Sequence, residues 1–392
     1  MGDDAISPFR LDVPEADLDD LRERLRRTRW PEAETVDDWS QGVPLAYVQE
    51  LCGYWAGGYD WRATEARLGG FPQFRTAIDG LGIHFLHVRS PHDDAFPLVL
   101  THGWPGSVVE FLDVIGPLTD PVAHGAPAGT GAFHVVCPSL PGYGFSARPD
   151  RPGWGVDRIA TAWAELMRRL GYDRYGAQGG DWGSMVTTAL GRLDPDHVAG
   201  IHVNMPVAGP PADGPEMTPD ELAGLAGYDE HRRWGTGYSK QQSTRPQTLG
   251  YGLVDSPAGQ CAWIVEKFWA WTDCDGHPER ALSRDEMLDD VTLYWVTATG
   301  ASSARLYWES MNAFGSSGGQ ERSDLGSRTG RVELPTGVAS FPKEIGPTPR
   351  SWCEANYNIT HWTTMPRGGH FAAFEQPELF VADMRTFFAT VR

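Results

Sequence analysis

Helical periodicity and one alternating pattern dominate the amino-terminal part of the chain. A proline at the first turn and a leucine face predict a helix over residues 14–29, before a Trp-Pro dipeptide. A second, aromatic-rich helix is predicted over residues 45–55. Two alternating segments, 74–78 and 83–88, flank the turn-forming dipeptide Asp79-Gly80, so this part of the chain predicts a β-hairpin.

From residue 97 onward, short apolar strands alternate with helices. The predicted strands are 97–100, 133–137, 174–178 and 198–203, and the predicted helices are 108–118, 156–170 and 182–192. The pattern resumes near the end of the chain with strands 338–341 and 359–365 and a helix over 377–388. Such alternation predicts an α/β fold, in which a mostly parallel sheet carries helices on both faces.

Between the two α/β segments, the regular alternation is lost. This stretch opens with several prolines and is rich in Trp and Tyr, which is typical of an inserted lid. We therefore expect three parts: an extension over 1–90, a core formed by 91–206 and 331–392, and a lid over 207–330.

Composition narrows the range of functions. The 392 residues include 33 Lys and Arg against 52 Asp and Glu, a net charge of −19, which disfavours nucleic acids and anionic membranes as partners. The five cysteines are scattered without a CxxC pair, so neither a disulfide framework nor a zinc site is predicted. Without a signal peptide or an 18-residue apolar run, the sequence predicts a cytoplasmic protein with no membrane span.

The segment Gly179-Gly180-Asp181-Trp182-Gly183 lies between a predicted strand and a predicted helix. Small residues two positions before and after the central side chain are required by a sharp strand–turn–helix elbow, because larger ones would clash. In many hydrolases, the residue at the centre of this elbow is a nucleophilic serine. Here the central residue is Asp181, which is therefore a candidate nucleophile. An aspartate capping a helix after a glycine turn is the alternative, and the motif alone does not decide between them. A literal GxSxG match around Ser317 has no strand before it and predicts a flexible loop.

The segment His102-Gly103-Trp104-Pro105 directly follows an early strand, where α/β-type hydrolases place an oxyanion-hole amide. The expected donors are the backbone N–H groups of Trp104 and Trp182. An ordinary Gly-Pro loop would explain this motif by itself, but the downstream elbow favours the oxyanion hole.

A histidine and a carboxylate in the last part of the chain complete a candidate triad. His370 follows a late strand and is flanked by glycines. A lone histidine is commonly structural, but the chain order of nucleophile, acid and histidine favours a general base. The acid should end the preceding strand, where Glu344 stands. Glu354 is the only other carboxylate between these two residues, but it falls in a predicted helix.

Taken in order, these motifs resemble the microsomal-type epoxide hydrolases of the α/β-hydrolase superfamily, over nearly the whole chain. The matching segments are TRWP at 28–31, HGWPGS at 102–107, PSLPGYGFS at 138–146, GGDWG at 179–183, EKF at 266–268, FPKE at 341–344 and GGHFAAFEQPE at 368–378. The resemblance implies an α/β-hydrolase fold with an inserted helical lid and an amino-terminal helical and hairpin extension. The membrane-anchoring helix of the animal members is missing, so the chain resembles a soluble bacterial member.

The resemblance also implies roles for individual residues. Asp181 matches the nucleophile, His370 the base and Glu344 the acid, while the lid tyrosines Tyr238 and Tyr307 match the family's donors to the epoxide oxygen. The expected reaction converts a small-molecule epoxide to a vicinal diol through an aspartyl ester, with no metal or organic cofactor. A homodimer is compatible with these expectations.

Two other functions stay open at this point. A haloalkane dehalogenase shares the aspartate elbow and the tryptophan after it, but it needs halide-binding N–H donors and no tyrosine pair. A non-catalytic ligand-binding protein of the same fold has no need of a nucleophile, acid, base and oxyanion loop together. The aromatic-rich lid predicts a bulky or aryl epoxide as substrate. A composition rich in Gly, Pro and Arg indicates a GC-rich bacterium, which suggests a role in natural-product biosynthesis, for example on an enediyne-type precursor.

Overall fold

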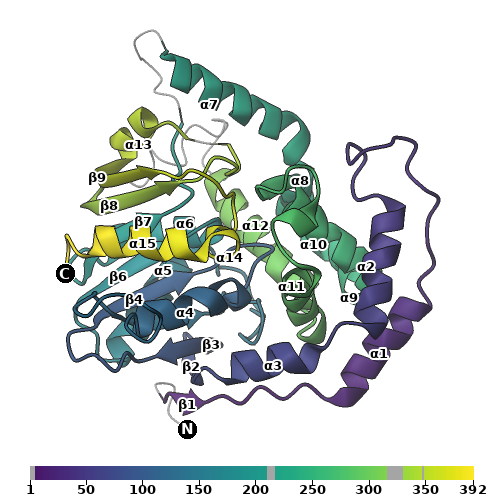
Figure 1. Cartoon of the computed structure of the whole chain (residues 1–392), viewed down its shortest axis with the longest axis horizontal. Helices are drawn as coiled ribbons and strands as arrows, with labels where there is room; N and C mark the ends of the chain where they lie inside the picture. Colours follow the sequence, from purple (N-terminus) through teal and green to yellow (C-terminus); the bar gives the residue numbers. More distant parts are fainter. Residues whose placement is uncertain (1–4, 210–216, 316–329, 347) are drawn as a thin grey trace.

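A computed structural model describes residues 5–209, 217–315, 330–346 and 348–392. The serine match at Ser317 and parts of the predicted lid lie outside the described residues. Within them, nine strands form one mixed sheet in the order β1-β2-β3-β5-β4-β6-β7-β8-β9 (Figure 1). The strands are β1 (Ser7–Pro8), β2 (Gln73–Ile78), β3 (Leu81–Val88), β4 (Phe96–Thr101), β5 (Phe133–Pro138), β6 (Tyr175–Gly179), β7 (Val198–Val203), β8 (Val332–Ser340) and β9 (Tyr357–Thr364).

The sheet has an antiparallel part and a parallel part. β1, β2 and β3 pair antiparallel, and β3 pairs antiparallel with β5, whereas every pairing from β5 across to β9 is parallel. The predicted hairpin is confirmed: β2 and β3 pair through a turn in which Asp79 and Gly80 both have positive φ, as a tight hairpin turn requires. β8 begins at Val332, earlier than the predicted residue 338, and β1 was not predicted.

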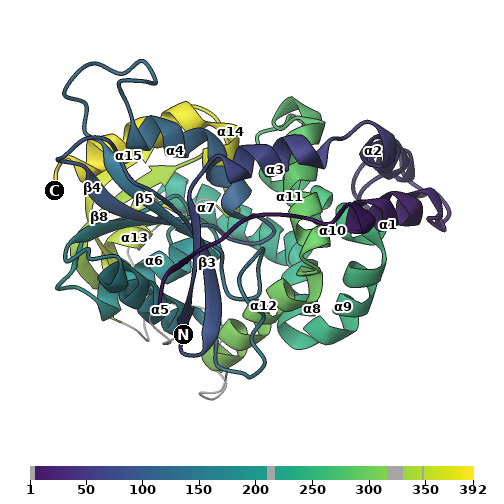
Figure 2. The same cartoon turned by 90° about the horizontal axis from the view of Figure 1, so that it is seen from below.

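Helices cover both faces of the parallel part, as predicted. α4 (Leu112–Thr119) and α15 (Pro377–Phe388) lie on one face, and α5 (Val156–Arg169) and α6 (Trp182–Leu193) lie on the other (Figure 2). A 3-10 turn, η1 (Val108–Phe111), takes the place of the first turn of the helix predicted at 108–118. The core lies between these layers, where every residue of β7 is buried.

Between β7 and β8, the regular elements of the described residues are all helices, and most of them lie beyond the carboxyl edge of the sheet (Figure 1). They are α7 (Pro219–Glu230), the π-helical η2 (His231–Gly235), α8 (Gly237–Thr244), α9 (Pro246–Asp255), α10 (Pro257–Trp271), the 3-10 helix η3 (Pro278–Arg280), α11 (Arg284–Val296) and α12 (Gly300–Gly315). Two further short helices, α13 (Arg350–Asn356) and α14 (Ala372–Glu375), follow β8 and β9.

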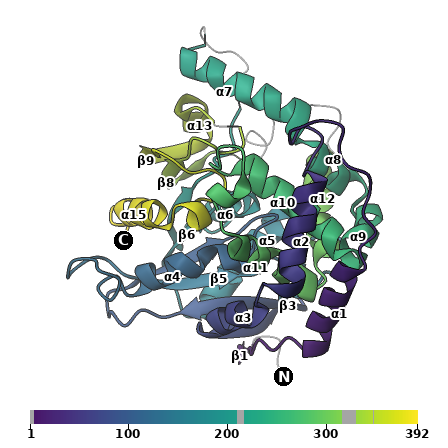
Figure 3. The ribbon, with the colours of Figure 1, turned by 45° about the vertical axis from the view of Figure 1, so that its right-hand side comes forward.

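The amino-terminal extension packs on the lid as well as on the sheet. α1 (Glu15–Arg26) and α2 (Leu45–Gly57) contact α10 (Figure 3), and the Trp55 indole donates a hydrogen bond of 2.8 Å to Thr292 of α11. α3 (Trp61–Gly69) was not predicted. We propose residues 1–90, 91–206 with 331–392, and 207–330 as the domain organisation.

Candidate active site

The sharp turn at Asp181 requires glycine at neighbouring positions, because larger side chains would clash with the backbone. Asp181 connects the end of β6 to the start of α6 with φ 50° and ψ −127°, a strained backbone conformation for a residue with a side chain. A Cβ atom on Gly179 would lie 2.1 Å from the Gly183 carbonyl oxygen, and one on Gly183 would lie 1.9 Å from the carbonyl oxygen of Thr101. The chain therefore turns sharply enough to present the Asp181 carboxylate at the carboxyl edge of the sheet.

The structure brings Asp181, His370 and Glu344 together from the ends of three parallel strands. His370 Nε2 lies 3.4 Å from Asp181 Oδ2, and His370 Nδ1 lies 2.5 Å from Glu344 Oε1. The same Glu344 oxygen accepts a 2.7 Å hydrogen bond from the Ile345 N–H. His370 also donates its backbone N–H to the Trp271 carbonyl oxygen at 2.8 Å, so the lid holds the histidine in place. The imidazole thus bridges two carboxylates, one at each ring nitrogen.

Electrostatics in this site favour a charged histidine. Burial lowers the pKa of His370, but the negative charges of Glu344 and Asp181 and their contacts with the ring raise this pKa well above its usual value overall. Any event that neutralises Asp181 removes part of this stabilisation and lowers the pKa of His370 again. The protonation of the histidine is therefore coupled to the state of the aspartate.

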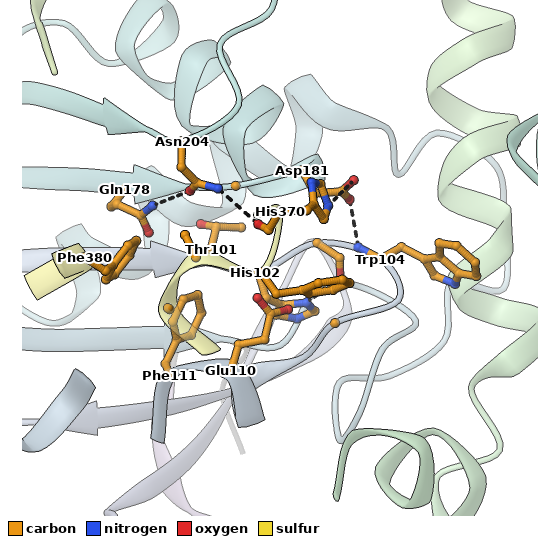
Figure 4. Close-up of a pocket in the computed structure, with 16 residues that line it drawn as sticks. Thr101, His102, Trp104, Glu110, Phe111, Gln178, Asp181, Asn204, His370 and Phe380 are labelled. Carbon is orange, nitrogen blue, oxygen red and sulfur yellow. Dashed lines mark hydrogen bonds and ion pairs between the residues drawn. The ribbon is translucent and has the colours of Figure 1, made fainter. Parts of the chain in front are cut away.

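The loop after β4 holds the other carboxylate oxygen. The Trp104 N–H donates a 2.8 Å hydrogen bond to Asp181 Oδ1 (Figure 4). A Cβ on Gly103 would lie 2.3 Å from both the Cβ and Oδ1 of Asp181, so only glycine allows this approach. Trp182, the other predicted donor, is the first residue of α6, where backbone N–H groups have no partner within the helix. His102 of the same loop is structural, because its ring accepts from the Leu140 N–H and contacts the Gly103 carbonyl oxygen, while burial lowers its pKa to about 4.

The two predicted lid tyrosines meet above the loop. The rings of Tyr238 in α8 and Tyr307 in α12 lie 5.7 Å apart, and both contact Trp104, the first stacked at 5.1 Å and the second edge-on at 5.8 Å. Burial, followed by nearby negative charge, raises the pKa of both hydroxyls. The Tyr307 hydroxyl has no hydrogen-bond partner among the described residues. The Lys267 ammonium group lies 4.4 Å from the centre of the Tyr238 ring.

Some residues at the site were not predicted. Asn204, which follows β7, donates a 3.4 Å hydrogen bond to the His370 carbonyl oxygen and accepts one of 3.1 Å from Gln178. Glu110 lines the same cavity as Asp181 and His370 (Figure 4). Its position gave a signal, since it is the first carboxylate in the largely apolar segment directly after the HGWPGS motif.

The described residues contain neither a group of metal ligands nor a membrane-spanning helix. No group of three or more His, Cys, Asp or Glu side chains there could hold a metal ion. No helix in the same ranges is long and apolar enough to cross a membrane.

Known proteins resemble this chain in sequence and in fold. The family model described as epoxide hydrolase N terminus matches residues 6–111, and the alpha/beta hydrolase fold model matches residues 97–236. A protein of Stigmatella aurantiaca, provisionally named an epoxide hydrolase, is 54% identical over 99% of this chain and 86% of its own length. Epoxide hydrolase 1 of Sus scrofa is 37% identical over 98% and 89%. The solved structure of Aspergillus niger epoxide hydrolase has a TM-score of 0.87 and 34% identity, covering 99% of this chain and 97% of that one.

Proposed function

This chain belongs to the epoxide hydrolases of the α/β-hydrolase fold, and from that premise we propose that it opens its substrate through a covalent ester on Asp181. The main support for this proposal is that the two oxygens of the Asp181 carboxylate have different contacts. Oδ1 is held by the Trp104 N–H at 2.8 Å, and Oδ2 lies at 3.4 Å from His370. One oxygen is therefore fixed by a backbone donor, and the other is left to attack.

In the first step, Oδ2 attacks an epoxide carbon and forms an alkyl ester, while the strained C–O bond breaks and its electron pair stays on the epoxide oxygen. The new alkoxide needs a proton, which Tyr238 or Tyr307 donates. Because burial raises the pKa of both tyrosines, their hydroxyls stay protonated at neutral pH and keep a proton to give.

The ester changes the state of the histidine. Esterified Asp181 is neutral, so the pKa of His370 falls and its proton can return to the tyrosinate. Neutral His370, oriented by Glu344, then takes a proton from water as the water oxygen bonds to the Asp181 carboxyl carbon. The N–H groups of Trp104 and Trp182 stabilise the resulting oxyanion. Collapse breaks the ester C–O bond, and the leaving diol oxygen takes the proton from His370. The Asp181 carboxyl group then gives its own proton to His370, which restores the ionised aspartate and the charged histidine.

The aromatic side chains around the carboxylate support a bulky apolar or aryl epoxide as the substrate class. The rings of Trp104, Tyr238 and Tyr307 contact one another at this position, and the Trp271 ring lies 5.0 Å from the His370 ring. A role in natural-product biosynthesis, a homodimer and a cytoplasmic location stay predictions from the sequence.

The His370→Ala variant tests the proposal, because it should form the ester and fail to hydrolyse it. With a reactive aryl epoxide, we expect the intact mass to rise by the whole mass of the substrate, since ring opening loses no atoms. The adduct should map to the peptide carrying Asp181 and be absent in Asp181→Asn. The exposed-histidine variant His197→Ala should turn over without accumulating an adduct.

Other outcomes identify the alternatives. An adduct that forms only with haloalkanes, lighter than the substrate by one HX, indicates a dehalogenase. Labelling of Ser317 indicates a serine pathway. Saturable ligand binding without any adduct or turnover indicates a non-catalytic protein. Each of these results contradicts the proposed mechanism.

A further inference from the structure

Glu110 is a carboxyl group that the mechanism above does not use. It lies in η1, where its neighbours Val108, Val109 and Phe111 are all buried. Glu110 itself keeps intermediate exposure, and it lines the cavity formed by the catalytic residues. A carboxyl group in such surroundings costs free energy unless polar partners compensate for the loss of water. This carboxyl group therefore needs polar partners, and the cavity beside it can provide them.

The loop before η1 is built to receive the Glu110 side chain. A Cβ on Gly106 would lie 1.4 Å from Glu110 Oε1, so the carboxyl group occupies the space that any larger residue at position 106 would fill. The Gly106 carbonyl oxygen accepts a 2.9 Å hydrogen bond from the Tyr294 hydroxyl, and Ser107 caps η1 through the Val109 N–H at 3.2 Å. These two contacts hold the loop, and the Glu110 carboxyl group fits against it only because residue 106 has no side chain.

The cavity is the size of a water molecule, and both polar and apolar groups line it. Its volume is about 20 Å³, which holds about one water, since one water needs roughly 10–15 Å³ by this measure. Polar groups that line it include the side chains of Glu110, Asp181, His370, Gln178 and Asn204. A water molecule there has enough hydrogen-bond partners to be ordered, and it lies beside both the base and the carboxylate that becomes the ester.

We propose that Glu110 is a positioning residue that holds the hydrolytic water in this cavity against His370 and the Asp181 carboxyl carbon. This inference rests on the proposed function. The Glu110 carboxyl oxygen accepts one hydrogen bond from the water, while His370 takes the proton that the water loses. Glu110 exchanges no proton in the step. Its contribution is the orientation of the water oxygen toward the ester carbon.

The charges around Glu110 agree with this role. Burial raises the pKa of Glu110 well above its usual value, and the negative charges of Asp290 and Asp181 act in the same direction. The charge of His370 and the Ser107 backbone act in the opposite direction and lower the pKa of Glu110. The neutral carboxyl group is therefore favoured, and it offers a carbonyl oxygen as acceptor without adding a third negative charge beside His370.

Rapid-quench kinetics on Glu110→Gln separate this role from a merely structural one. We expect ester formation on Asp181 at the wild-type rate and ester hydrolysis slowed by about 10²-fold, the usual effect of misplacing a reacting group by about 1 Å. Gly106→Ala should give the same signature, because it displaces the carboxyl group without removing it. The control is Glu354→Gln, which neutralises a carboxylate of α13 that pairs with Arg350 and should leave the ratio of the two rates unchanged.

The outcomes are distinct. Equal slowing of both steps in Glu110→Gln with an unchanged melting temperature overturns the inference, as does wild-type hydrolysis in this variant. If Glu110→Gln does not fold, Gly106→Ala decides by the same criterion. If no ester forms on Asp181 even in His370→Ala, the proposed function itself fails. If the ester forms on Asp181 and its hydrolysis rate is unchanged in Glu110→Gln, only the role proposed for Glu110 fails.

Discussion

Replacing Glu344 with glutamine should slow ester hydrolysis far more than ester formation. The 2.5 Å contact between Glu344 Oε1 and His370 Nδ1 orients the imidazole with Nε2 free to accept a proton. In Glu344→Gln, an amide N–H group facing Nδ1 would reverse the tautomer, leaving Nε2 protonated and unable to act as a base. The opposite amide orientation would bury the N–H₂ group where Oε2 now has no hydrogen-bond partner among the described residues. Both arrangements cost activity, by about 10²–10⁴-fold in hydrolysis.

The pH dependence of Glu344→Gln should shift in a defined direction. The negative charge of Glu344 is the largest of the effects that raise the pKa of His370, so its removal lowers that pKa. A base with a lower pKa stays neutral to lower pH. The acidic limb of the hydrolysis rate should therefore move to lower pH, even though the maximal rate falls.

Rapid-quench kinetics with a chromophoric aryl epoxide, measured across pH, give both quantities. Glu354→Gln is the matched control, because this carboxylate lies in α13 and pairs with Arg350 rather than with His370. We expect the control to behave as wild type. Equal slowing of both chemical steps in Glu344→Gln, or an acidic limb that moves to higher pH, would refute the reasoning.

Further variants probe three other parts of the structure. Tyr238→Phe and Tyr307→Phe should each keep measurable turnover and the double variant should lose about 10²–10⁴-fold, because either hydroxyl can protonate the same oxygen; near-wild-type turnover of the double variant contradicts the assignment. Gly103→Ala should lower kcat/KM by about 10²–10³-fold, because the new Cβ would displace the Asp181 carboxylate. An unchanged kcat/KM would mean that the loop after β4 moves and the carboxylate does not. Asp290→Asn should raise the melting temperature more above pH 8 than at pH 5. Burial raises the pKa of Asp290 to about 8, so ionisation of this group destabilises the folded state as pH rises from about 4 to 8. An equal gain in melting temperature at both pH values contradicts this.

The parts of the fold that the sequence predicted are those with strong local causes. The elbow follows from the steric demand for glycine around Asp181, and the hairpin follows from a dipeptide that tolerates positive φ. The alternation of strands and helices predicted the parallel sheet, because each strand must bury both faces. The helical position of Glu354 was also predicted, and α13 confirms it.

Features that depend on distant packing were not predictable. α3 was missed because its buried face is only Trp61, Thr64 and Leu68, although Asp60 caps its first turn by accepting from the Arg62 N–H. The separate helices of the lid were not resolved from the sequence, since their apolar residues face the extension, the core and the site at once. The position of Glu110 depends on the missing side chain at Gly106, a contact that local sequence does not encode.

A single turnover in ¹⁸O-labelled water tests the central claim, that Asp181 attacks the epoxide and water attacks the ester. With enzyme in excess over substrate, we predict an unlabelled diol, because its new oxygen comes from the Asp181 carboxylate. The ¹⁸O should appear in the peptide that carries Asp181. A diol labelled in the first turnover, with no label in that peptide, would show direct attack of water on the epoxide and contradict the account.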